Sequence, residues 1–272
     1  MRTRFALVLL ALFIAASPNS GRLSVQAFQA PETGPGVATI WYLGHCGYAV
    51  KTARHLLLFD YIELEETARE RSLSKGFVDP AEIAGLNVSV FVSHNHLDHY
   101  DPVILDWQKT IPAIQYFFGW NAGLGARHRD MAGPRASAAL DGMQIDTVNS
   151  HHSGVAEVAW LVRVDGLTIF HAGDYQGKMA QGAPSNAAED IRYLMSKAGR
   201  VDLAFVGATV DDWNLTVIRG LAPRVAFPMH YRKREDQYKV FAVDLARAGV
   251  DTPVVCPSRR GDRFEFKDGR VR

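Results

Sequence analysis

The segment NVSVFVSHNHLDH, residues 87–99, decides how the rest of this chain is interpreted. Its first six residues are mostly apolar, β-branched or aromatic, which predicts a buried strand. The strand leads directly into four potential metal ligands, His94, His96, Asp98 and His99. Alternate residues of an extended chain share a face, so the imidazoles of His94 and His96 project together, and Asp98 and His99 can turn toward a neighbouring position. Imidazole nitrogens and carboxylate oxygens suit a borderline divalent cation such as zinc, so one loop could serve two adjacent ions.

Three later segments place a histidine or an aspartate at the end of an expected strand. They are NSHHSG at 149–154, FHAGD at 170–174 and FPMHY at 227–231. Loops at the ends of neighbouring strands can converge when the strands lie in packed sheets. These segments therefore supply the ligands that a metal site built on residues 94–99 would still lack.

The apolar pattern predicts two successive series of strands. The first comprises 38–44, 48–52, 55–61 and 87–92, and the second comprises 142–150, 157–166 and 167–173. Asp165-Gly166 is a hairpin turn signal, and Asp79-Pro80 marks a helix start. From residue 187 to residue 256 helices and strands alternate, and the last of them is a strand over 252–256. This order indicates two sheets packed face to face with helices outside. For 101–129 we expect loops and short elements, with the aromatic YFFGW stretch in the core rather than in a lid.

The first 27 residues have the layout of a secretory signal peptide. Arg2 and Arg4 precede an apolar run from Phe5 to Ala16, which small and polar residues follow. The run is too short to span a bilayer comfortably, so we expect no stable membrane span. We therefore predict a removable leader over 1–27 and a single domain over 28–272, exported to the periplasm or the extracellular space.

Composition limits the partners. The 272 residues carry 30 Lys and Arg against 29 Asp and Glu, a formal charge of +1, and no basic tract is evident. Such a balance offers no electrostatic footprint for nucleic acid, so a small-molecule substrate is the better expectation. The only two cysteines, Cys46 and Cys256, lack the spacing of a structural zinc or redox motif, and the sequence leaves open whether they pair.

The motifs, taken in order from WYLGH at 41–45 through HNHLDH, HHSG and HAGD to PMH, resemble the metallo-β-lactamase superfamily. The resemblance is strongest to its branch of broad-specificity metal-dependent hydrolases, which includes ascorbate-phosphate lactonase-like and phospholipase D-like members. It covers nearly all of the chain after the leader. It implies the metallo-β-lactamase fold, an α/β four-layer αββα sandwich of two mixed β-sheets flanked by helices.

The resemblance also implies a ligand set for two divalent metal ions, zinc by preference and manganese or iron as alternatives. The first ion would take His94, His96 and His152, the second would take Asp98, His99 and His230, and Asp174 would bridge the two. His151 stays the alternative to His152, because adjacent strand residues point in opposite directions.

Other residues are candidates for contacting substrate or orienting a ligand: His45, Asp60, Tyr175 and Tyr231. His45 resembles a histidine in the family's Gly-His-Ser segment, but Cys46 stands where serine is usual, and its approach to the metals stays open. Asp60 either orients a ligand histidine or begins a turn. The isolated histidines have a structural interpretation: His55, His128 and His171.

The constellation predicts a binuclear hydrolase. Two adjacent cations lower the pKa of a water between them and supply hydroxide, with Asp98 and Asp174 as the catalytic carboxylates. The expected target is an ester-type bond in a lactone, a phosphodiester or a related small molecule, and an amide such as a β-lactam stays open. The alternatives are an iron-dependent oxidoreductase of the same superfamily and a non-catalytic metal-binding or sensing protein.

Overall fold

The structure is a computed structural model that describes residues 34–63, 70–152, 154–175 and 187–272. The leader predicted over 1–27 lies outside these residues. Among the described residues, no helix combines the length and the apolar character needed to cross a membrane.

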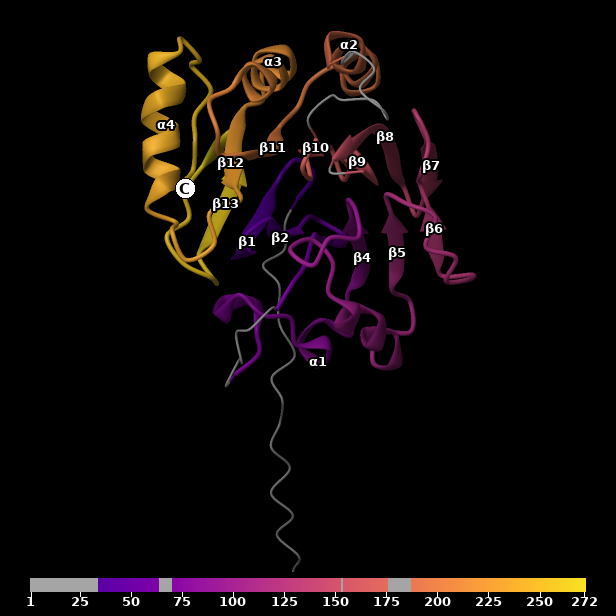
Figure 1. The fold of residues 1–272 in the computed structure, drawn as a ribbon. Coiled ribbons are helices and arrows are strands. Elements are labelled where there is room, and N and C mark those ends of the chain that lie inside the picture. Colours follow the sequence, from indigo (N-terminus) through magenta and orange to yellow (C-terminus); the bar gives the residue numbers. More distant parts are fainter. Residues whose placement is uncertain (1–33, 64–69, 153, 176–186) are drawn as a thin grey trace, which may run out of the picture.

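Two mixed β-sheets pack face to face (Figure 1). The first sheet has the strand order β14-β13-β1-β2-β3-β4-β5-β6, and the second has the order β12-β11-β10-β9-β8-β7. The strands of the first sheet are β1 (Ala38–Gly44), β2 (Gly47–Lys51), β3 (His55–Phe59), β4 (Asn87–Val92), β5 (Gln115–Phe118), β6 (His128–Asp130), β13 (Arg263–Lys267) and β14 (Arg270–Val271). Those of the second are β7 (Ser137–Leu140), β8 (Met143–His152), β9 (Val155–Val164), β10 (Leu167–His171), β11 (Leu203–Gly207) and β12 (Val225–Met229).

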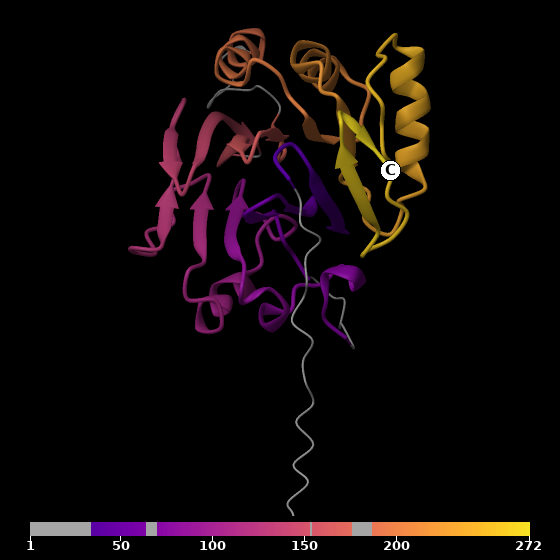
Figure 2. The ribbon, with the colours of Figure 1, turned by 180° about the vertical axis from the view of Figure 1, so that it is seen from behind.

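Helices cover the outer faces of both sheets (Figures 1 and 2). The second sheet carries α2 (Ala187–Ala198), α3 (Asp212–Leu221) and α4 (Gln237–Arg247). The first carries α1 (Pro80–Ile83) and two 3₁₀ segments, η1 (Leu73–Lys75) and η2 (Pro102–Lys109). The four-layer αββα sandwich of two mixed sheets is thus confirmed. The helix start at Asp79 is confirmed too, since its carboxylate accepts a hydrogen bond from Ala81 N.

The central strands of the first sheet are buried on both faces. In β1, Ile40 and Tyr42 face the core between the sheets, whereas Trp41 and Leu43 pack under the outer layer that includes α1 and η2. Such a strand has no polar face, so it reads in the sequence as a continuous apolar run rather than an alternating one.

One region agrees with the sequence-based expectation and another differs from it. Within 101–129, where loops and short elements were expected, Tyr116–Phe118 form part of β5 and are fully buried, so the core position of these aromatic residues is confirmed. The strand expected over 252–256 is wrong, because only an isolated bridge between Val254 and Ala226 forms there. The segment 252–256 leads instead to β13, which pairs antiparallel with β1. Pairing between segments this distant in sequence leaves no local signal.

A buried carboxylate joins the two sheets at the end opposite the histidine-rich segment 94–99. Asp165, in the β9–β10 turn, accepts hydrogen bonds from Thr52 Oγ1 at 2.7 Å and from Arg54 N at 2.8 Å, and lies 3.0 Å from His55 Nδ1. Burial alone would raise its pKa, but these partners in the β2–β3 turn outweigh burial and hold the pKa of Asp165 well below its ordinary value. His55 therefore has the structural role expected of it.

Replacing this carboxylate should weaken the whole fold. Asp165→Ala would leave the buried Thr52 Oγ1 and His55 Nδ1 without this acceptor, so we expect a loss of about 2–4 kcal/mol in the free energy of unfolding, measured by urea denaturation. Asp268→Ala is the matched control, since Asp268 also precedes a glycine in a hairpin turn with positive φ but is exposed. It should cost about 1 kcal/mol or less. Equal losses in the two variants would show that turn strain, not the buried carboxylate, is what matters.

Candidate metal centre

The predicted site residues gather at one edge of the sandwich, where several strands end. His45 and Cys46 form the turn between β1 and β2, Asp60 follows β3, and residues 94–99 follow β4. From the second sheet, Asp174 follows β10 and His230 follows β12. The sequence motifs thus meet because the ends of these strands face the same side of the molecule.

Three residues at this edge have a backbone conformation that side chains other than glycine seldom allow. His45, Asp60 and His230 have φ values of 53°, 41° and 81°, in the left-handed region that non-glycine residues seldom occupy. Such conformations persist when the surrounding structure holds them, and they cluster at functional sites. Here they turn side chains from both sheets toward a common centre.

One group of potential ligands comprises His94, His96 and Asp174. His94 Nε2 lies 3.0 Å from His96 Nδ1 and 3.7 Å from Asp174 Oδ2. Burial, and then the neighbouring His99, lower the pKa of His94 to about 4. His94 is therefore a neutral imidazole at pH 7, which is the form that binds a metal.

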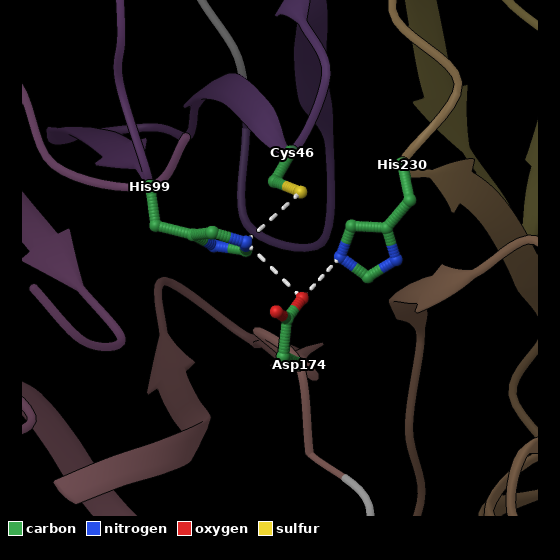
Figure 3. Close-up of side chains that lie close together, drawn as sticks. All are labelled: Cys46, His99, Asp174 and His230. Atoms are coloured by element: carbon green, nitrogen blue, oxygen red, sulfur yellow. Dashed lines mark hydrogen bonds and ion pairs between the residues drawn. The ribbon is translucent and has the colours of Figure 1, made fainter. Parts of the chain in front are cut away.

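A second group comprises Cys46, His99, Asp174 and His230, whose side chains point toward one another (Figure 3). Asp174 Oδ1 lies 3.1 Å from His99 Nε2 and 2.6 Å from His230 Nε2. Cys46 Sγ lies 3.7 Å from His99 Nε2. Asp174 therefore contributes to both groups.

Asp98 lies beside this second group but is paired with His45. The resemblance implied instead that Asp98 joins His99 and His230. Asp98 Oδ2 is 3.3 Å from His45 Nε2, and the two form a third potential ligand group with His99. Among the described residues, Asp98 shares no such group with His230; Cys46 has that position instead. His45 is the main reason that the pKa of Asp98 is held below its ordinary value.

Asp60 orients His99. The carboxylate is fully buried, accepts hydrogen bonds from Ser93 N and Ser93 Oγ at 2.7 Å each, and lies 2.8 Å from His99 Nδ1. Burial would raise the pKa of Asp60, but His171, His99 and Ser93 together lower it. With its Nδ1 directed at Asp60, His99 turns its Nε2 toward Asp174. Asp60 thus has the geometry of a ligand-orienting residue, and the sequence left this choice open.

The remaining candidates for metal or substrate contact are His152, Tyr175 and Tyr231, and they differ in position. His152 ends β8 at the same edge, but the side chains of His151 and His152 lie outside the described part of the structure, so the choice between them stays a prediction. Tyr175 is buried, donates a hydrogen bond to Asp190 and contributes to the cavity wall described below. Tyr231 packs against Tyr238 instead.

The two other histidines with a structural interpretation lie outside the ligand groups. His171 stacks on Phe59 and accepts a hydrogen bond from Gly173 N, and His128 stacks on Tyr116. Both cysteines are free, so Cys46 and Cys256 do not pair.

A cavity of about 540 Å³ opens over the ligand groups. The wall is formed by the ligand groups and by the segment around the start of α3, after β11. Its residues include His45, Asp98, Asp174, Tyr175, Thr209, Asp211, Trp213, Asn214 and His230. Sequence reasoning missed Thr209, Asp211, Trp213 and Asn214. The available signal was an aspartate after a buried strand and before a helix, since Asp211 caps α3 by accepting hydrogen bonds from Trp213 N and Asn214 N.

The donor sets fit divalent metal ions. Bonds of about 2.0–2.3 Å in a tetrahedral site put neighbouring donor atoms about 3.3–3.8 Å apart. The separations of 3.1 Å between His99 Nε2 and Asp174 Oδ1 and 3.7 Å between His99 Nε2 and Cys46 Sγ are near this range, and the 2.6 Å between Asp174 and His230 is shorter. His230 Nε2 supports the fit independently: it is buried and makes no well-aligned hydrogen bond, although Asp174 Oδ1 is only 2.6 Å away. His230 Nε2 and Asp174 Oδ1 are close enough to each other to bind the same ion.

Comparison with known proteins identifies the family. Residues 39–230 match the family described as "Beta-lactamase superfamily domain". The match covers most of the chain, so the chain belongs to this superfamily. A protein of Opitutus terrae named "UPF0173 metal-dependent hydrolase" is 26% identical over an alignment 244 residues long, and the alignment covers 79% of this chain and 96% of that protein.

Solved structures share the fold. Igni18 of Ignicoccus hospitalis KIN4/I, described as a metallo hydrolase, has a TM-score of 0.62 at 17% identity, over 85% of this chain and 99% of that one. CmlA of Streptomyces venezuelae, a diiron β-hydroxylase, has a TM-score of 0.58 at 12% identity, over 88% of this chain and 55% of that one. At such identities the likeness concerns the fold alone.

Removing the Asp60 carboxylate should destabilise the metal-free protein. Asp60→Ala leaves Ser93 N and His99 Nδ1 buried without their acceptor, so we expect the free energy of unfolding to fall by about 2–5 kcal/mol in urea denaturation. Asp106→Ala, which removes an exposed carboxylate paired with Lys109, should change it by about 0.5 kcal/mol or less. An unchanged stability for Asp60→Ala would mean that water replaces the carboxylate without cost.

Proposed function

We propose that this protein is a hydrolase that uses two divalent metal ions, zinc by preference, to cleave an ester-type bond in a small molecule. The observation that carries the proposal is the position of Asp174. Its carboxylate stands between a group containing His94 and His96 and a group containing His99 and His230, beneath an open cavity. A carboxylate shared by two sets of nitrogen donors suits two neighbouring ions rather than one.

Each part of the site has a chemical task in this proposal. Bound ions would supply hydroxide near neutral pH and polarise the scissile bond. His94, His96, His99 and His230 would hold the ions, with Asp174 between them. The Asp98 carboxylate, half-exposed at the cavity wall, would orient the attacking water, and His45, 3.3 Å away, would keep that carboxylate in place. Asp60 would keep the Nε2 of His99 directed at its ion.

An ester-type substrate agrees with the character of the cavity. The wall is lined by polar side chains that can hydrogen-bond a small molecule, such as Thr209 and Asn214, together with the half-buried ring of Trp213. We place the chain with the broad-specificity hydrolases of its superfamily, whose ascorbate-phosphate lactonase-like and phospholipase D-like members it resembles in its motifs. The name of the Opitutus terrae relative supports a metal-dependent hydrolase.

Iron-dependent oxidation is the second candidate, because the fold likeness to CmlA shows that the same scaffold serves a diiron hydroxylase. The two candidates differ in their metal. A ligand set of histidines and carboxylates accepts either zinc or iron. The identity of the bound metal therefore separates the hydrolase from the oxidoreductase.

Elemental analysis should find about two ions of zinc or manganese per chain after purification without chelators or added metal. In His94→Ala the content should fall to about one or less, because this residue is central to the first group. His128→Ala is the matched control, since its imidazole stacks on Tyr116 away from the centre, and it should retain the full content. Iron as the native metal would favour the oxidoreductase, and a folded protein without metal would refute both candidates.

Hydrolysis should be found in a panel of lactones, phosphodiesters and β-lactams, and it should require the metal. We expect chelation to abolish turnover and added zinc to restore it. Asp98→Ala should lower kcat about 100-fold or more if Asp98 orients the attacking water, whereas Asp106→Ala should not change it. Full turnover in Asp98→Ala would remove Asp98 from the mechanism, and a metal-loaded protein inert across the panel would favour a binding or sensing role.

A further inference from the structure

Cys46 is the one member of the second ligand group that the family motif does not supply. It lies in the turn between β1 and β2, next to His45, and its side chain is fully buried. Its Sγ is 3.7 Å from His99 Nε2 and, with the ligand atoms of Asp174 and His230, falls within a set whose members all lie within 4.8 Å of one another. Figure 3 shows the thiol directed at the same point as the other three side chains.

The backbone around Cys46 holds this direction. The Cys46 carbonyl lies 3.0 Å from His171 Nε2, and the ring of His171 stacks on Phe59 at 5.0 Å with an interplanar angle of 7°. On the other side, the positive φ of His45 turns the chain sharply just before the thiol. At Gly47 an added Cβ would stand 3.1 Å from Gly44 O, so this turn is closely packed. The thiol position is therefore set by the fold rather than by a free rotation of the loop.

The surroundings of Cys46 differ from those of a thiol that only fills space. The nearest polar atoms belong to side chains that bind metals, whereas Cys256, half-buried, donates a hydrogen bond to the carbonyl of Tyr238 at 3.2 Å. Neither cysteine forms a disulfide. Meanwhile Asp98, which the resemblance assigns to the second ion, is paired with His45.

We propose that the second ion is held by Cys46 together with His99, Asp174 and His230, and that Asp98 stays paired with His45 at the cavity wall. This inference rests on the proposed function, since it assumes that the centre binds metal. A thiolate is a soft ligand that favours zinc over manganese, so Cys46 would bias the second position toward zinc. The departure from serine at this position would then set the metal preference of the protein.

Cobalt substitution tests the sulfur ligand directly. In the full-length protein loaded with Co²⁺, a thiolate ligand produces an intense near-ultraviolet charge-transfer band that nitrogen and oxygen ligands lack. We expect this band in the wild type and in Cys256→Ser, and its loss in Cys46→Ser. A wild type without the band, or a band that persists in Cys46→Ser, would overturn the proposal.

Zinc X-ray absorption of the wild type keeps the test decisive if the Cys46 variant does not fold. We expect one sulfur atom at about 2.3 Å from zinc for every two zinc ions bound. A first shell of nitrogen and oxygen alone would exclude Cys46 as a ligand, whatever the variants do.

Competition between zinc and manganese tests whether Cys46 makes the second position prefer zinc. Cys46→Ser should weaken binding of the second zinc ion about 100-fold and binding of manganese less than about 10-fold, because hydroxyl oxygen suits the harder ion. Equal changes for both metals would refute the proposed preference. A protein that binds two ions and hydrolyses its substrate, but shows no sulfur ligand, refutes this inference alone. A protein that binds no metal refutes the proposed function as well.

Discussion

The fully buried carboxylate of Asp60 is the interaction on which the centre depends. It follows β3 with a left-handed backbone, and it joins that strand end to the loop after β4 through Ser93 and His99. A carboxylate in such a place is costly unless all of its oxygens are occupied by donors, and here they are. The loop that carries the histidines is therefore positioned by the core, which is why a short loop can hold several imidazoles in one arrangement.

The sandwich makes that centre possible by bringing strand ends from two sheets to one edge. The first sheet contributes the residues after β1, β3 and β4, and the second contributes those after β10 and β12. The strands supply the apolar core, and the described ligand side chains come from the segments that follow them. Asp174 and His230 come from the second sheet, so each ligand group that contains them closes only when the two sheets are packed. The metal centre therefore forms only when the core between the two sheets has folded.

Membership of the superfamily and the identity of the reaction are separate questions. The family match and the fold likenesses describe a scaffold on which hydrolases and a diiron hydroxylase both occur. The features of this chain that bear on its chemistry are local: Cys46 beside His99, Asp98 paired with His45, and a cavity wall that includes Trp213. Such features decide chemistry and specificity, because function belongs to sites rather than to folds.

The sequence by itself determined the fold class, most strands and the metal-binding motifs, because each rests on local information. Apolar runs specify buried strands, Asp165-Gly166 specifies a hairpin, and the closely spaced histidines of 94–99 need no distant partner to be recognised. Only the tertiary structure decided that β13 pairs with β1, that Asp60 orients His99, and that Cys46 rather than Asp98 stands with His230. The reason is physical: these contacts join residues far apart in the chain. Their geometry depends on strand register and on a few strained turns, neither of which leaves a periodic trace in the sequence.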